Sequence, residues 1–225
     1  APDGEVEDYS LEIIAPTPGD LVLSEFLSNP EGTDGGLEWF EIYAAAAFDL
    51  NGVQVGKDLS SLDPLVTGNE CVSASAGDYI LIANDLDTTL NGGLPPVDFV
   101  FDFALGNSAG SLVVAYEGAA LDSMTWDTSL STSGAAANLD PDFFDPLLAD
   151  DAANWCEATL PYGGGLQLGT PGAANENCPI APPEGECLEN GRFRPTVTPT
   201  LGDLVISEFH ANPDIVDDAD GEWFE

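Results

Sequence analysis

Carboxylates are the only abundant chemically active side chains in this chain, and they could bind a metal or, in pairs, act as acid and base. The 225 residues include 41 Asp and Glu but one histidine, His210, and no hydrolase elbow, phosphate-binding loop or zinc-protease motif. A histidine base needs organised partners, and His210 lies in a repeated segment where the other copy has Leu27. Because acid pairs arise by chance in so acidic a chain, they do not indicate catalysis. We therefore expect no enzyme activity.

Calcium is the one ligand whose chemistry fits this composition, because it takes six to eight oxygens and tolerates irregular acidic loops. Two loops qualify, with the acidic residues Asp140, Asp142, Asp145, Asp150 and Asp151 in one, and Asp214, Asp217, Asp218, Asp220 and Glu222 in the other. The run 218–221 has a D-x-D-G pattern, but its spacing departs from that of an EF-hand loop. A calcium site and a solvated acidic loop both remain open, and no other cofactor is expected.

The chain is strongly negative. Its acidic residues are opposed by Lys57, Arg192 and Arg194 alone, for a formal net charge of −38. Nucleic acids and anionic membranes are bound mainly through lysine and arginine, so neither is an expected partner. No apolar run is long enough for a membrane-spanning helix. Salt adaptation, the solubility of an exported protein and the binding of divalent cations all remain open as reasons for the acidity.

Four cysteines favour an extracellular or cell-surface location. Cys71, Cys156, Cys178 and Cys187 form an even set without any C-x-x-C pair, which indicates disulfides and not zinc ligation. Three pairings are possible. We favour Cys71 with Cys156 and Cys178 with Cys187, because the second pair lies close together in a proline-rich stretch that has little else to hold it. Four buried free thiols are the alternative.

An internal repeat is the most informative pattern in the chain. Residues 16–30 read PTPGDLVLSEFLSNP, and residues 199–213 read PTLGDLVISEFHANP. The match resumes with EWFE at 38–41 and at 222–225, with one residue inserted in the second copy. We predict an N-terminal extension (1–16), a complete domain (17–177), a proline-rich linker with a disulfide (178–199) and the first strands of a second copy (200–225).

Short apolar runs between turn residues predict an all-β fold. The clearest expected strands are 21–26, 39–43, 78–83, 97–103, 111–116 and 121–126. Within 39–43, Trp39 and either Phe40 or Ile42 should alternate between the faces of a strand, with one face inward. Several runs are almost continuously apolar, as expected of strands packed inside a sandwich. No segment shows a convincing helical stripe with caps.

Five motifs in order resemble the lamin-tail domain family, in the form found in exported bacterial and archaeal proteins. They are LVLSEFLSNP, EWFEIY, AGDYILIAND, FALGNSAGSLVV and the closing NWC with GTPGAAN. The resemblance covers about residues 19–177 and restarts at Gly202. It implies an immunoglobulin-like β-sandwich without an active site, used beside catalytic domains or in tandem in surface proteins. The chromatin contacts of eukaryotic relatives do not carry over, because this chain lacks the basic surface they need.

The partial second copy leads to two functional hypotheses. The first is a non-catalytic extracellular structural module, a repeat-built or self-assembling surface or filament protein whose partner is itself. Its second-copy strands would complete a neighbour's sheet or continue a tandem array, unless the boundary has no functional meaning. The assembly residues would be Leu204, Val205, Ile206, Phe209 and Trp223. The second hypothesis is a ligand- or polysaccharide-binding accessory domain, with an aromatic platform drawn from Trp126, Tyr116 and Tyr162.

Overall fold

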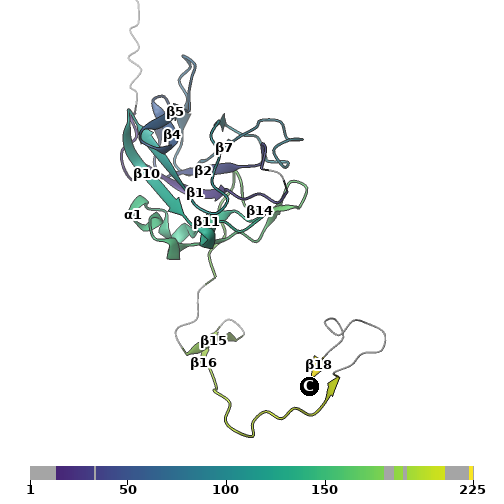
Figure 1. Cartoon of the computed structure of the whole chain (residues 1–225). Coiled ribbons are helices and arrows are strands. Elements are labelled where there is room, and N and C mark those ends of the chain that lie inside the picture. The colour runs from purple at the N-terminus through teal and green to yellow at the C-terminus, as the bar shows by residue number, and fades with distance from the viewer. Residues whose placement is uncertain (1–13, 33, 180–184, 190–191, 211–222, 225) are drawn as a thin grey trace, which may run out of the picture. The chain divides into compact units, whose positions relative to one another are not determined.

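The first part of the chain folds as an all-β sandwich, and a separate small unit comes after it in the sequence (Figure 1). The computed structural model describes residues 14–32, 34–179, 185–189, 192–210 and 223–224. It divides into two compact units, Ala1–Pro179 and Ile180–Glu225. The all-β sandwich predicted from the strand-like runs is confirmed.

The larger sheet of the first unit has six strands among the described residues, antiparallel except for the last pair. In spatial order they are β12 (Trp155–Glu157), β11 (Ala137–Leu139), β1 (Leu21–Leu27), β2 (Trp39–Ala44), β7 (Tyr79–Ala83) and β8 (Phe99–Val100). Strands β1 and β2 lie in its middle, where neighbours on both sides satisfy their backbone groups. This position explains why their sequences are almost continuously apolar.

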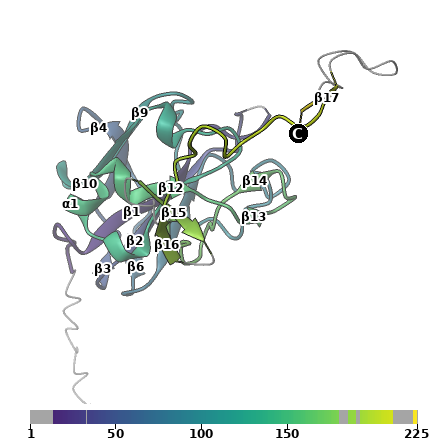
Figure 2. The same ribbon diagram turned by 90° about the horizontal axis from the view of Figure 1, so that it is seen from below.

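The smaller sheet supplies the opposite wall of the sandwich. Its strands, in spatial order, are β10 (Ala119–Trp126), β9 (Gly110–Tyr116), β4 (Val53–Asp58) and β5 (Ser61–Pro64). Short strands form two further pairs, β3 (Phe48–Asp49) with β6 (Ser73–Ala74), and β13 (Pro161–Tyr162) with β14 (Gln167–Leu168). Short helical turns are η1 (Thr128–Leu130), η2 (Pro141–Phe143), α1 (Pro146–Ala149) and η3 (Ala152–Asn154). Helix α1 and the β13–β14 pair lie at opposite sides of the sandwich (Figure 2).

Both faces of strand β2 are buried, and not one face alone as the sequence pattern suggested. Phe40 and Ile42 point into the main core between the two sheets. Trp39 points to the other face, into a smaller apolar cluster that includes Leu27 and Leu81. This second cluster forms because the segments after β7 and after β12 cover the outer face, as Leu94 and other cluster members show. Because both faces are buried, a large-to-small substitution on either face of β2 should leave a cavity and destabilise the fold.

The hairpin between β9 and β10 contains the one non-glycine residue with positive φ among the described residues. Glu117 has φ 48°, and the next residue, Gly118, has φ 81°. Two central residues with positive φ form a type I′ turn, for which Asn-Gly is preferred. We expect Glu117→Asn to raise the free energy of unfolding by about 1 kcal/mol in urea titrations, because asparagine tolerates this conformation better. Gly118→Ala, with no atom within 4 Å of the new Cβ, should lower it by a similar amount.

The disulfide pairing that we favoured from the sequence is wrong. Cys156 is bonded to Cys178, with a Cα–Cα distance of 5.6 Å, and Cys71 and Cys187 are free thiols. The pairing of β12 with β11 sets Cys156 opposite Asn138. The side chain of Asn138 in turn holds the segment that precedes Cys178, because its Nδ2 donates to the Glu176 carbonyl (2.8 Å) and its Oδ1 accepts from the Glu176 N–H (3.2 Å). Tertiary contacts therefore bring the two sulfurs together.

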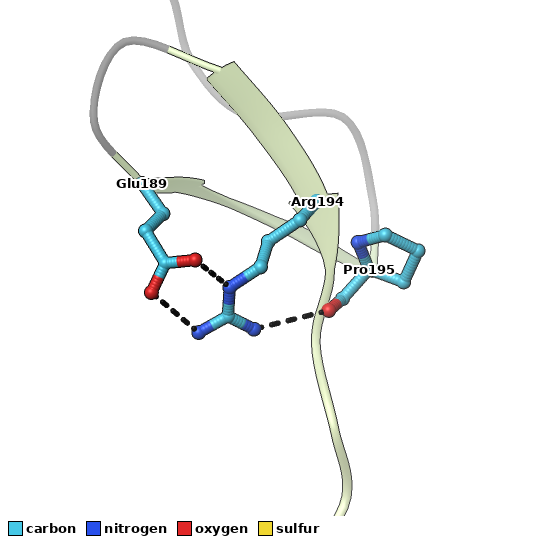
Figure 3. A network of polar contacts seen from close by, with 3 residues as sticks. All are labelled: Glu189, Arg194 and Pro195. Atoms are coloured by element: carbon cyan, nitrogen blue, oxygen red, sulfur yellow. Dashed lines mark hydrogen bonds and ion pairs between the residues drawn. The ribbon is translucent and has the colours of Figure 1, made fainter.

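The second unit begins with a hairpin in a stretch that the sequence suggested was a linker. Strand β15 (Glu186–Glu189) pairs with β16 (Arg192–Pro195). The guanidinium of Arg194 binds the carboxylate of Glu189 through Nε (2.8 Å) and Nη2 (3.4 Å), and its Nη1 donates to the Pro195 carbonyl (3.3 Å) (Figure 3). Both side chains of this ion pair are exposed, so its contribution to stability is small.

Candidate functional site

Two glutamates are buried side by side at the centre of the larger sheet. Glu25 of β1 and Glu41 of β2 are partners in the strand register, and they are 1% and 0% exposed. Both lie on the outer face of the sheet, the face that Trp39 shares, while Phe26 and Phe40 point into the main core. Two acids at such a position need partners, because burying an unpaired carboxylate costs several kcal/mol.

Most of the partners come from a single segment more than a hundred residues away, residues 169–175, which we call the closing segment. Thr170 donates its N–H to both carboxyl oxygens of Glu25 (2.9 and 3.1 Å) and its hydroxyl to one of them (2.8 Å). Gly172 donates its N–H to Oε2 of Glu41 (2.6 Å), and Ser24 donates its hydroxyl to Oε1 (2.9 Å). The two glutamates therefore fix this segment across the outer face of the sheet.

The two ends of the closing segment also have specific contacts. At its start, a Cβ on Gly169 would lie 2.9 Å from the Trp39 ring and 3.2 Å from a Glu25 oxygen, so only glycine fits. At its end, Asn175 donates its side-chain amide to the carbonyls of Ser24 (2.7 Å) and Leu139 (2.9 Å). The motif GTPGAAN thus has a physical role, which is to cover β1 and β2.

Burial raises the pKa of both glutamates. Loss of hydration raises the pKa of Glu25 to about 7, against the lowering effect of the hydrogen bonds from Thr170. Loss of hydration also raises the pKa of Glu41 well above its usual value, and the nearby Glu25 raises it further. Raised pKa values often mark an acid–base site, but these carboxyls are closed to solvent, and they accept hydrogen bonds from Thr170, Gly172 and Ser24 of the chain itself. Their arrangement fits a structural role. We call Glu25, Glu41 and the closing segment that they bind the clasp.

Two further acids have strongly raised pKa values at other points of the sandwich. Burial raises the pKa of Asp122 to about 7, while its Oδ2 accepts from the Leu23 N–H (2.6 Å) and so joins β10 to β1. Burial likewise raises the pKa of Glu38 to about 7, and its Oε2 accepts from the Leu105 N–H (3.1 Å). Each of these carboxyls therefore joins two segments of the sandwich through its hydrogen bond.

Three of the five candidate carboxylates in the acidic loop 140–151, a calcium candidate from its sequence, cap short helical turns. Asp140, Asp145 and Asp151 accept from the first N–H groups of η2, α1 and η3. Asp140 also accepts from the Cys178 N–H (2.9 Å). Within the described ranges, no three or more acidic, histidine or cysteine side chains are grouped to hold a metal. The second candidate set, Asp214, Asp217, Asp218, Asp220 and Glu222, lies outside the described residues.

The aromatic residues proposed as a ligand platform do not form one. Trp126 is buried, and its Nε1 donates to the Gly106 carbonyl (2.9 Å). The Tyr162 hydroxyl accepts from Nε1 of Trp39 (2.8 Å) at the edge of the outer cluster. Tyr116 packs against the main core beside Gly52. Core packing therefore accounts for all three side chains.

The second copy repeats the strand register of the first. Strand β17 (Phe209–His210) pairs with β18 (Trp223–Phe224). Phe209 is paired with Phe224, as Phe26 is paired with Phe40 in the first copy. His210 is paired with Trp223, as Leu27 is paired with Trp39. The glutamates of the clasp recur as Glu208 and Glu225 in the sequence. Their recurrence at matched positions in two copies was the sequence signal for the clasp, and our reading of the sequence missed it.

Three of the predicted assembly residues lie outside any strand. Leu204, Val205 and Ile206 are exposed in the part of the second unit that the structure describes, and β17 begins three residues later. Phe209 and Trp223 belong to the β17–β18 pair. None of the helices found among the described residues is long and apolar enough to cross a membrane. Comparisons of the chain with protein-family models, with curated proteins and with solved structures found no match.

Proposed function

We propose that this chain is a non-catalytic structural module of a repeat-built extracellular or cell-surface protein, in which lamin-tail-like, immunoglobulin-like sandwiches follow one another and self-associate. The observation that carries the proposal is the β17–β18 pair, which has the register of β1–β2. A repeat that keeps its sequence and its register is typical of arrays in which each copy is one structural unit.

A second support is the exposed apolar start of the second copy. Leu204, Val205 and Ile206 are 78, 78 and 69% exposed, whereas their counterparts, residues 21–23, are fully buried in β1. An apolar stretch that is core in one copy and exposed in the other offers surface for a neighbouring strand. The residues proposed for self-association are Leu204, Val205, Ile206, Phe209 and Trp223.

The cysteines and the charge support the proposed extracellular or cell-surface location. The bond between Cys156 and Cys178 ties the closing segment to the sandwich, and such bonds persist in oxidising compartments. A net charge of −38 keeps exported modules soluble and disfavours nucleic acid as a partner. Calcium, if it binds, would act at the acidic stretch 214–222 as a support for assembly and not as a catalyst.

The test of self-association uses the whole chain and two matched substitutions. Val205→Glu places a charge in the exposed repeat segment, and Val197→Glu places the same charge at a residue that is 83% exposed and outside the repeat. We expect sedimentation velocity and negative-stain electron microscopy to detect oligomers or filaments of the unmodified chain and of Val197→Glu. Val205→Glu and a chain truncated after Pro199 should be monomeric.

The same sedimentation and microscopy experiments could also contradict the proposal. Monomers of the unmodified chain at every concentration, with and without added calcium, would exclude self-association. If the chain truncated after Pro199 still assembles, the self-association contact lies in residues 1–199 and the second copy is not needed for it. Assembly that requires calcium would assign a function to the acidic residues between β17 and β18.

A further inference from the structure

An open groove lies beside the larger sheet, between the β3–β6 pair and strands β7 and β8. Its volume is about 600 Å³, which is within the range of small-ligand sites. Leu50, Ala74 and Ile80 contribute an apolar lining, and the polar lining includes Ser73, Asp78, Tyr79 and Asp98. Gly172 of the closing segment borders it as well. Neither the clasp nor the strand repeat uses these polar groups.

Two aspartates in this groove have acceptor capacity that the protein leaves free. Asp78 accepts from the Ser75 N–H through Oδ2 (2.7 Å), and Asp98 accepts from the Leu81 N–H through Oδ2 (2.9 Å). Neither Oδ1 accepts a hydrogen bond from a described residue. Both carboxylates line the same groove, and the charge of Asp78 adds to burial, the larger cause, in raising the pKa of Asp98. Both side chains are accessible to solvent.

An aromatic cluster stands at the same end of the sheet. The rings of Tyr43 and Tyr79 have their centroids 5.1 Å apart, and Phe144 packs on Tyr43 at 4.6 Å. All three are partly exposed, unlike the aromatic residues of the core. Tyr79 lines the groove, and its ring packs against Tyr43 and Phe144. A ring with a negative face attracts the weakly positive C–H groups of a ligand.

The charge of the groove limits the ligand class. No lysine or arginine lines it, and the whole chain is strongly negative, so a phosphate, sulfate or acidic polymer would be repelled. Free carboxylate oxygens accept hydrogen bonds from hydroxyl groups, and such charge-assisted bonds are strong. A ligand with many hydroxyls on one edge and C–H groups on its face would satisfy both the aspartates and the ring.

We propose that this groove is a binding site for a neutral saccharide. The hydroxyls of one sugar ring donate to Oδ1 of Asp78 and of Asp98, and the C–H face of a ring packs on Tyr79. This activity goes beyond assembly, because it would attach the module to a neutral polysaccharide. It depends on the first unit alone and does not require the second copy.

The experiment titrates the whole chain with cellohexaose and with maltohexaose by isothermal calorimetry, with oligogalacturonate as the acidic comparison. We expect one neutral hexasaccharide to bind weakly, with a Kd of about 1 mM or below, and the acidic one not to bind. Tyr79→Ala and Asp98→Asn should each weaken binding by at least about tenfold. Asp63→Asn, on the exposed strand β5, is the matched control and should bind as the unmodified chain does.

Several results would overturn the proposal. These are no binding by either neutral sugar, and binding by Tyr79→Ala or Asp98→Asn that is as tight as that of the unmodified chain. Hydrogen exchange on the unmodified chain checks the site without any substitution, in case a variant fails to fold. Saccharide should protect amides of residues 73–80 and 98–99, and protection confined to other segments would place the sugar elsewhere.

Discussion

Raising the pH from about 5 to about 8 should lower the free energy of unfolding of the sandwich by at least about 3 kcal/mol. Burial raises the pKa of Glu25 from 4.5 to about 7, so the folded protein holds this proton more tightly than the unfolded chain. The resulting stabilisation is complete below the unfolded pKa and is lost as the pH rises through about 7. Glu41, whose pKa is also raised, adds a loss in the same direction.

Exposed carboxyls with lowered pKa values change the free energy of unfolding in the opposite direction, but in a lower pH range. Hydrogen bonds from Thr159 lower the pKa of Glu176, and hydrogen bonds from Thr89 lower that of Asp87. Their stabilising effect is present above the unfolded pKa values and is lost only as the pH falls below about 4. We therefore expect a stability maximum at about pH 5, and not at neutral pH.

Urea titrations at a series of pH values measure this dependence, and glutamine substitutions locate it. Glu25→Gln keeps the shape of the side chain but removes its proton equilibrium, so the loss between about pH 5 and 8 should shrink by roughly 3 kcal/mol. Glu70→Gln, at an exposed loop position, should leave the dependence unchanged. If the free energy of unfolding does not change between about pH 5 and 8, then Glu25 and Glu41 do not hold their protons more tightly in the folded protein than in the unfolded chain.

Loss of the Cys156–Cys178 bond should lower the free energy of unfolding by about 3 kcal/mol. The bond closes a loop with a sequence separation of 22 residues, which limits the freedom of the unfolded chain. It also holds the end of the closing segment near the strand pair that the segment covers. The measurement is urea unfolding of the double variant Cys156→Ala and Cys178→Ala under non-reducing conditions.

The free cysteines provide the control for this prediction. Cys71 is an exposed free thiol, so Cys71→Ala should change the free energy of unfolding by less than about 0.5 kcal/mol. Thiol titration of the denatured, unreduced chain should find Cys71 and Cys187 reactive and the other two blocked. A large loss on Cys71→Ala, or reactive thiols at Cys156 and Cys178, would show that another pairing exists in solution.

The clasp connects these predictions to the proposed array. In the first copy, residues 169–175 cover the glutamates of β1 and β2, and the sequence of the second copy repeats both glutamates as Glu208 and Glu225. Because the covering contacts depend on buried acids, conditions that ionise Glu25 and Glu41 should loosen the segment before they unfold the sheets. A loosened segment would expose the apolar outer face that includes Leu27 and Trp39 to a neighbouring molecule.

The sequence by itself determined the local architecture. Strands β1, β2, β7, β9 and β10 lie within one or two residues of the runs expected, because alternating or continuous apolar residues between turns specify strands locally. The internal repeat was also readable without coordinates, and the β17–β18 register agrees with it. Strands β4, β5, β11 and β12 were missed, because their short segments lack such a run.

Only the tertiary structure decided the pairings across long distances. Thr170 meets Glu25 over a separation of 145 residues, and Leu23 meets Asp122 over 99. No local pattern distinguishes such a carboxyl from the many acids at the surface, because the signal is burial, which depends on the packing of both sheets. The same reason explains the wrong disulfide: proximity in sequence favoured Cys187 for Cys178, but the contacts of Asn138 place Cys178 beside Cys156.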